Sequence, residues 1–123
     1  MVELSARVHP DVLFAYSQNF VNLIIRVENH DPSLFWCEID IKVPESLSLS
    51  PTSDLQKGRV RVGILTKKEF IEKLVKIFAN QYTPPQIYPI FITLYLFNKD
   101  GVIESRLEKK IEIRCEVKKE ETL

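Results

Sequence analysis

The sequence is short of glycine and cysteine and carries no net charge. It contains three glycines and two cysteines, and 17 basic side chains balance 17 acidic ones. Two cysteines are too few for a disulfide framework or a four-cysteine zinc site. A balanced charge, with a pI near 6.7, provides no uniform positive field for non-specific nucleic-acid binding. We therefore predict no nucleic-acid partner.

Long hydrophobic runs are also missing. No stretch approaches the roughly 18 uninterrupted apolar residues of a membrane helix, so no membrane insertion is expected. The first residues, "MVELSARVHPDVLF", show no basic region followed by an apolar run of the kind found in signal peptides. We expect a cytoplasmic protein from the sequence as given, or an extracellular one if it is a fragment of a longer exported chain.

What the sequence does contain is alternation of apolar and polar residues. Its 123 residues fit one domain, which we place at 1–117, followed by a charged tail at 118–123. The many isoleucines, with charge dominated by Lys and Glu, resemble a thermophile-like composition. A turn at Asn98-Lys99-Asp100-Gly101 joins the last two strands as a hairpin, since Gly101 can take a positive φ. Period-two patterns predict strands over residues 2–9, 20–29, 35–43, 59–65, 87–97 and 102–117.

The segment 66–80, "TKKEFIEKLVKIFAN", has two interpretations. Its apolar residues form a helical stripe, and Thr66 with Glu69 has the spacing of a helix capping box. The regular strand spacing on both sides instead favours a strand, with Ile71 and Val75 on one face and Phe70 and Leu74 on the other. A short amphipathic helix and a strand both remain open.

Counting this segment as a strand gives an all-β, immunoglobulin-like antiparallel β-sandwich of about seven strands. The stretch "LIIRVENHDPSLFWCEIDIKVPESLSLSP", with Val27-Glu28-Asn29 and Val43-Pro44, resembles the prokaryotic CARDB-type adhesion or interaction modules. The strand "IYPIFITLYLF" is similar to their Tyr-x-Ile-x-Val strand, and Tyr88 stands where such folds often place a corner tyrosine. The resemblance implies a sandwich that binds or spaces other molecules.

Trp36 raises the main functional question. In "FWCEIDIKVP" it shares the polar face of a strand with Glu38 and Asp40. The strand 87–97 is apolar on both faces, whereas a strand covered on one side should alternate. If the two strands are neighbours, four aromatic side chains share one outer face: Trp36, Phe91, Tyr95 and Phe97. A helix at 66–80 could cover this face; otherwise it is exposed and points to a partner.

No catalytic or metal constellation is apparent. His9-Pro10-Asp11 and His30-Asp31-Pro32 are typical turn sequences, and the length of strand 20–29 keeps the two histidines apart. Cys37 and Cys115 fall at apolar positions of their strands, so we expect buried reduced thiols, not a nucleophile or a disulfide. We predict no enzyme activity, no catalytic residue, no metal and no cofactor.

These observations lead to a non-catalytic module that mediates protein–protein association through the outer aromatic face. The partner is predicted to be another protein or a second copy of the chain. Two alternatives stand beside this interpretation. One is an accessory module that binds carbohydrate or another small ligand on an aromatic platform, and the other is a structural domain of a larger assembly.

Overall fold

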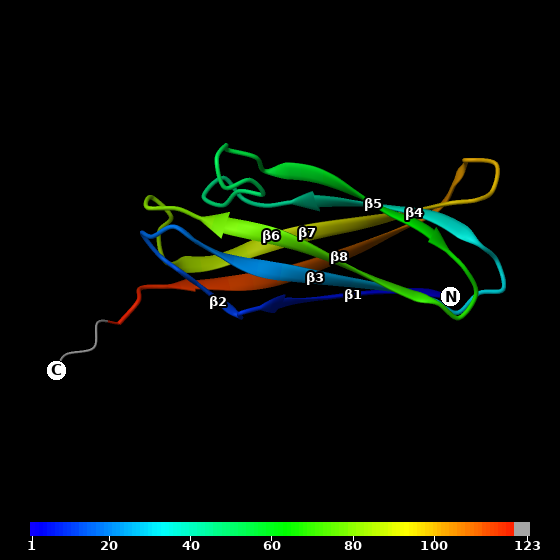
Figure 1. Ribbon diagram of the computed structural model, residues 1–123, viewed down its shortest axis with the longest axis horizontal. Coiled ribbons are helices and arrows are strands. Elements are labelled where there is room, and N and C mark those ends of the chain that lie inside the picture. Colours follow the sequence, from blue (N-terminus) through cyan, green and yellow to red (C-terminus); the bar gives the residue numbers. More distant parts are fainter. Residues whose placement is uncertain (120–123) are drawn as a thin grey trace.

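A computed structural model describes residues 1–119 as eight strands in two packed sheets (Figure 1). The all-β sandwich predicted from the sequence is confirmed at this level. Residues 1–119 form no helix that is long and apolar enough to span a membrane. The strands are β1 (Val2–His9), β2 (Val12–Phe14), β3 (Asn19–Asn29), β4 (Phe35–Lys42), β5 (Lys57–Leu65), β6 (Phe70–Ala79), β7 (Gln86–Phe97) and β8 (Ile103–Glu116).

The two sheets differ in size. One has the order β1-β3-β6 and the other the order β2-β8-β7-β4-β5. All pairs are antiparallel except β2 with β8, which run parallel. Strand β5 pairs with β4, so it extends the larger sheet. The larger sheet therefore offers an outer face four long strands wide.

The strand predicted at 2–9 forms as β1 in the smaller sheet, and a short additional strand, β2, follows it in the larger sheet, which accounts for eight strands where we predicted about seven. Residues up to His9 pair with β3, and the residues after Asp11 pair with β8. The peptide bond between His9 and Pro10 is cis. A proline lacks the backbone N–H that continuous pairing requires, so the ladder of hydrogen bonds stops where the chain crosses from one sheet to the other.

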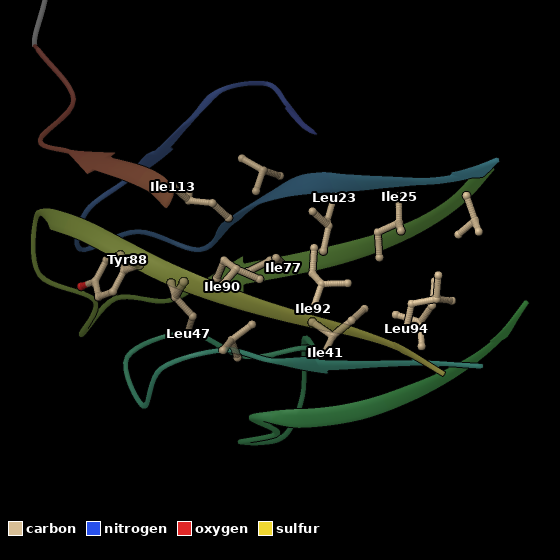
Figure 2. Packing of buried hydrophobic residues seen from close by; sticks show 14 of the residues in the cluster. Leu23, Ile25, Ile41, Leu47, Ile77, Tyr88, Ile90, Ile92, Leu94 and Ile113 are labelled. Carbon is tan, nitrogen blue, oxygen red and sulfur yellow. The ribbon is translucent and has the colours of Figure 1, made fainter. Parts of the chain in front are cut away.

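The core lies between the two sheets and is almost entirely aliphatic. Side chains alternate inward from β3 and β7, as Leu23, Ile25, Ile90, Ile92 and Leu94 show in Figure 2. Burying each such side chain stabilises the fold by roughly 1.5–3 kcal/mol. The alternation seen in the sequence is therefore the pattern of this core.

Residues 66–80 resolve as a turn followed by strand β6, and the helical alternative is wrong. Thr66 and Glu69 do interact, but within a turn: the Glu69 N–H donates to the Thr66 carbonyl oxygen at 3.3 Å, and Lys68 has a φ of 61°. The strand pairs with β3 along its whole length. Ile77 is buried in the core, while Phe70 and Leu74 are exposed on the opposite face. Apolar residues on both faces of one strand produced the apparent helical stripe.

The final hairpin forms as predicted. β7 and β8 pair across a turn in which the Gly101 N–H donates to the Asn98 carbonyl oxygen, and Gly101 has a φ of 76°. At the other end of β7, Tyr88 is fully buried, and its hydroxyl donates to the Pro84 carbonyl oxygen at 2.5 Å. This bond four residues back is the contact that a corner tyrosine makes.

The loop between β4 and β5 meets β6 at a single bridge between Ser48 and Phe78, with Leu47 buried beneath it. The strands run from Val2 to Glu116, and the single-domain range 1–117 stays a prediction. Of the predicted charged tail 118–123, residues 120–123 lie outside the described part of the chain.

Candidate functional site

The predicted aromatic residues lie on the outer face of the larger sheet, which we call the β4–β7 face. Strand register arranges this face in four rows running across β5, β4, β7 and β8. The rows contain, in order, Ile64, Trp36, Phe97 and Ile103; then Arg61, Glu38, Tyr95 and Arg106; then Arg59, Asp40, Thr93 and Glu108; and last Lys57, Lys42, Phe91 and Lys110.

The first row is apolar and close to the final hairpin. Trp36 lies directly opposite Phe97 on β7 and opposite Ile64 on β5. Trp36 is 40% exposed, and Ile64 is 52% exposed. Together with Leu34 they line a hollow of about 530 Å³ that also reaches Lys99 and Gly101 in the hairpin turn. An exposed apolar row beside a hollow is the type of surface that contacts partners.

Ile64 joins this row because of a β-bulge at Gly63. Cys37 pairs with Gly63 and Glu38 with Arg61, so Val62 is an extra residue in β5. Gly63 has a φ of 104°, in the region that favours glycine. The extra residue reverses the alternation, and so Val62 is buried while Ile64 faces outward. Ile64 was not predicted for this face because simple alternation does not reveal a bulge, although Gly63 within a strand was the available signal.

Oppositely charged side chains form ion pairs in the two middle rows. The Arg59 guanidinium donates to both carboxylate oxygens of Asp40, with Nε 2.7 Å from Oδ1 and Nη2 3.1 Å from Oδ2. Its Nη1 lies 3.3 Å from a carboxylate oxygen of Glu38. The hydrogen bond from Arg59 holds the pKa of Asp40 below its usual range. The same guanidinium lies 5.5 Å from the ring centroid of Tyr95, within cation–π range.

The fourth row places lysines around an exposed aromatic ring. Phe91 is opposite Lys42 on one side and Lys110 on the other, and Lys42 is opposite Lys57. Like charges directly opposite each other weaken a pair of strands. This end of the face is therefore basic, in contrast to the apolar end.

The structure brings some of the predicted site residues together and separates others. Trp36 and Phe97 are cross-strand neighbours, and Tyr95 lies one row away beneath Arg59. Phe91 is six residues from Phe97 along the same strand, a distance of about 20 Å. The contiguous apolar surface is thus formed by Trp36 and Phe97 with Ile64 and Ile103, and Phe91 belongs to the basic end.

The outer face of the smaller sheet carries a second group of apolar side chains. Phe20 and Phe78 are cross-strand partners with ring centroids 5.7 Å apart. Leu74 is 58% exposed, and Arg26 lies 3.7 Å above the ring of Phe70. Arg26 covers the ring of Phe70, and Phe20 and Phe78 cover each other in part, whereas Leu74 lies on the edge strand β6 opposite Ile24.

The two thiols lie far apart, and the two histidines lie toward opposite ends of β3. Cys37 is fully buried, and burial raises its pKa to about 11, which disfavours the reactive thiolate. Cys37 pairs with Leu96 and Cys115 with Gln86, so ten residues of β7 separate the two free thiols. That offset of about 33 Å along the strand is far too long for a disulfide. His9 is opposite Asn22, while His30 follows the far end of β3.

Among known proteins, this chain has a structural match but no sequence match. No family model matches the sequence, and no curated protein matches it. Among solved structures, Spo0M, a sporulation control protein from Bacillus subtilis, is similar over 95% of this chain, with a TM-score of 0.54 and 10% sequence identity. The chain spans 50% of the length of that Spo0M chain. At this identity the likeness shows a shared fold.

Proposed function

We propose that this chain is a non-catalytic, immunoglobulin-like module that associates with protein through the β4–β7 face, and that its partner is a second copy of the chain. The observation that carries the proposal is the half-exposed Trp36, flanked by Phe97 and Ile64 in one apolar row. Leaving several such side chains in water forgoes roughly 1.5–3 kcal/mol each that burial would provide.

The immunoglobulin-like assignment is supported by strand order and by Tyr88. The order β1-β3-β6 corresponds to strands A, B and E, and β8-β7-β4-β5 corresponds to G, F, C and the additional C′ strand of variable-type domains. Tyr88 makes the backbone contact expected of a corner tyrosine. The CARDB-type resemblance stays a prediction from sequence motifs.

The first and third rows complement themselves about a two-fold axis parallel to the strands, whereas the second and fourth rows would place Arg61 against Arg106 and Lys57 against Lys110. Such an axis, placed between β4 and β7, lays β4 over β7 and β5 over β8 of the other copy while each row meets itself. In the first row Trp36 then meets Phe97. In the third row Arg59 meets Glu108. Two sheets that pack face to face in this way keep their strands within about 30°.

The apolar row also favours a protein partner over a small polar ligand. A carbohydrate platform needs free hydrogen-bonding side chains beside the rings. The polar groups nearest Tyr95 are already engaged with one another, since Arg59 donates to Asp40 and lies within ion-pair distance of Glu38.

The test is sedimentation by analytical ultracentrifugation over a wide range of concentrations. The wild-type chain should form a concentration-dependent dimer, and Ile64→Glu should raise the dimer dissociation constant more than tenfold, because the new charge would be desolvated without a partner. Leu74→Glu is the matched control: it places the same charge at a similarly exposed apolar position on the other sheet.

Three outcomes would overturn this proposal. A wild-type chain that stays monomeric at millimolar concentration excludes the second copy as partner. A dimer that survives Ile64→Glu but is lost in Leu74→Glu moves the interface to the smaller sheet. A dimer unaffected by either substitution excludes both faces. Circular dichroism of each variant verifies that the fold is retained.

A further inference from the structure

Three side chains with metal-ligand chemistry converge on the outer surface of the smaller sheet. Glu3 on β1 and Glu28 on β3 are direct cross-strand partners, and His30 is the first residue after β3. His30 Nε2 lies 3.2 Å from an oxygen of Glu28 and 3.6 Å from an oxygen of Glu3. One atom from each side chain lies within 4.8 Å of the other two.

Backbone hydrogen bonds fix the segment from which His30 projects. The His30 N–H donates to the Met1 carbonyl oxygen at 2.8 Å, which extends the β1–β3 ladder by one step. The buried Asn29 side chain donates to the Ser33 carbonyl oxygen at 2.8 Å and accepts from the Asp31 N–H at 2.9 Å. The loop that carries His30 is therefore anchored on both sides of the histidine.

The two carboxylates face each other at a cost that a cation would relieve. Like charges directly opposite in a sheet are destabilising. Arg26 compensates Glu28 at one oxygen only, with its Nε 2.6 Å from Oε1, so that Oε2 is directed toward His30. A hydrogen bond to the second oxygen of a ligating carboxylate is the usual outer contact that orients a metal ligand.

The two separations between the imidazole nitrogen and the carboxylate oxygens match tetrahedral coordination. Zinc binds imidazole nitrogen and carboxylate oxygen at about 2.0–2.2 Å, and a tetrahedron of that radius has edges of about 3.3–3.6 Å. The two nitrogen–oxygen separations of 3.2 and 3.6 Å are close to such edges. Calcium and magnesium prefer larger sets of oxygen ligands, so an imidazole ligand favours a transition metal.

We propose that Glu3, Glu28 and His30 form a surface site for a divalent transition metal of the zinc class, with a fourth position left for water. The bound ion would tie β1 to the loop after β3. From the sequence, His30 was assigned to a turn and no metal was predicted, because Glu3 is 27 residues away in the chain and approaches only through strand pairing. This site is independent of the β4–β7 face.

The proposal is tested by isothermal titration calorimetry. The metal-free full chain is titrated with Zn²⁺ in a non-coordinating buffer at neutral pH. The wild type should bind one equivalent, and both His30→Ala and Glu3→Gln should weaken binding more than tenfold. His9→Ala is the matched control, since it removes the other histidine and should bind like the wild type. Zn²⁺ should also raise the thermal midpoint of the wild type and of His9→Ala, but not that of His30→Ala.

The proposal is overturned if the wild type binds no Zn²⁺, or if His30→Ala binds it as tightly as the wild type. Loss of binding in His9→Ala but not in His30→Ala would also overturn it. Glu3 and His30 are both exposed side chains, so neither substitution should unfold the chain. If His30→Ala nevertheless unfolds, the Zn²⁺ affinity of Glu3→Gln still decides the proposal.

Discussion

Arg59 on β5 holds Asp40 on β4 in a two-pronged ion pair at the centre of the β4–β7 face. A planar guanidinium matches a carboxylate in this geometry, so the pair has defined orientation as well as charge. The same guanidinium lies over Tyr95. The pair therefore separates the apolar row at one end of the face from the lysines at the other.

The Asp40–Arg59 pair should contribute a pH-dependent part of the stability. The pKa of Asp40 is lowered in the folded state, so its contribution is present above the unfolded pKa of about 3.9 and is lost as pH falls through the folded value. Because both side chains are more than a third exposed, Asp40→Asn should cost less than about 1 kcal/mol at neutral pH. Urea midpoints of wild type and variant should differ at neutral pH and converge well below the unfolded pKa. A difference in urea midpoint that stays constant with pH for Asp40→Asn would contradict the assignment.

Both thiols should resist modification in the native state. Cys37 and Cys115 are buried, and burial raises the pKa of each. A thiol reagent added to the native chain should therefore react slowly with both, and unfolding in guanidinium should release two equivalents. Fast native labelling of both cysteines would show that the core opens readily. Cys115→Ser identifies which thiol accounts for any intermediate rate.

Gly63→Ala should destabilise the chain through the backbone alone. A Cβ added at Gly63 would meet nothing within 4 Å, but the φ of 104° disfavours any other residue. Non-glycine residues in such conformations cost about 1–3 kcal/mol. Gly58→Ala is the matched control on the same strand: there a Cβ would lie 3.1 Å from the end of the Leu49 side chain. Chemical denaturation should show the larger loss at Gly63, and equal losses would argue against the bulge.

Tyr88→Phe should measure the corner hydrogen bond. The substitution keeps the buried ring and removes the hydroxyl that donates to the Pro84 carbonyl oxygen. Losing a buried hydrogen bond while leaving its acceptor unpaired should cost about 1–2 kcal/mol. Tyr82→Phe, at an exposed position, should leave the unfolding free energy unchanged. An unchanged value for Tyr88→Phe would mean that the ring alone accounts for the role of this residue.

Most of the fold could be predicted because its core is simply periodic. β3, β4 and the β7–β8 hairpin follow from alternation and one glycine turn, and the buried positions Leu23, Ile39 and Ile113 are those that the pattern assigns to the core. β6 was ambiguous because a strand with Phe70 and Leu74 outside and Ile71 and Val75 inside satisfies a helical period as well. Only its pairing with β3 decides between them.

The candidate site was harder to predict because it depends on which strands are neighbours. The adjacency of Trp36 and Phe97 followed once β4 and β7 were assumed to pair, and the structure pairs them. Ile64 could not be placed, since it faces outward only through the Gly63 bulge and reaches Trp36 only because β5 extends the same sheet. The contact of His30 with Glu3 likewise depends on the β1–β3 register.

The crossing of the chain from β1 in one sheet to β2 in the other has a mechanical consequence. Met1 and the end of β8 lie toward opposite ends of the long axis (Figure 1), and β2 runs parallel to β8. A pull applied between the two ends of the molecule would act along the strand axes of β1 and β2. The eight β1–β3 pairs and the three β2–β8 pairs would then be loaded in shear, with each ladder straining as a unit. Under tension, the hydrogen bonds of such a domain would break together at one force. In a ladder that is pulled from one end, the hydrogen bonds would instead break one pair after another.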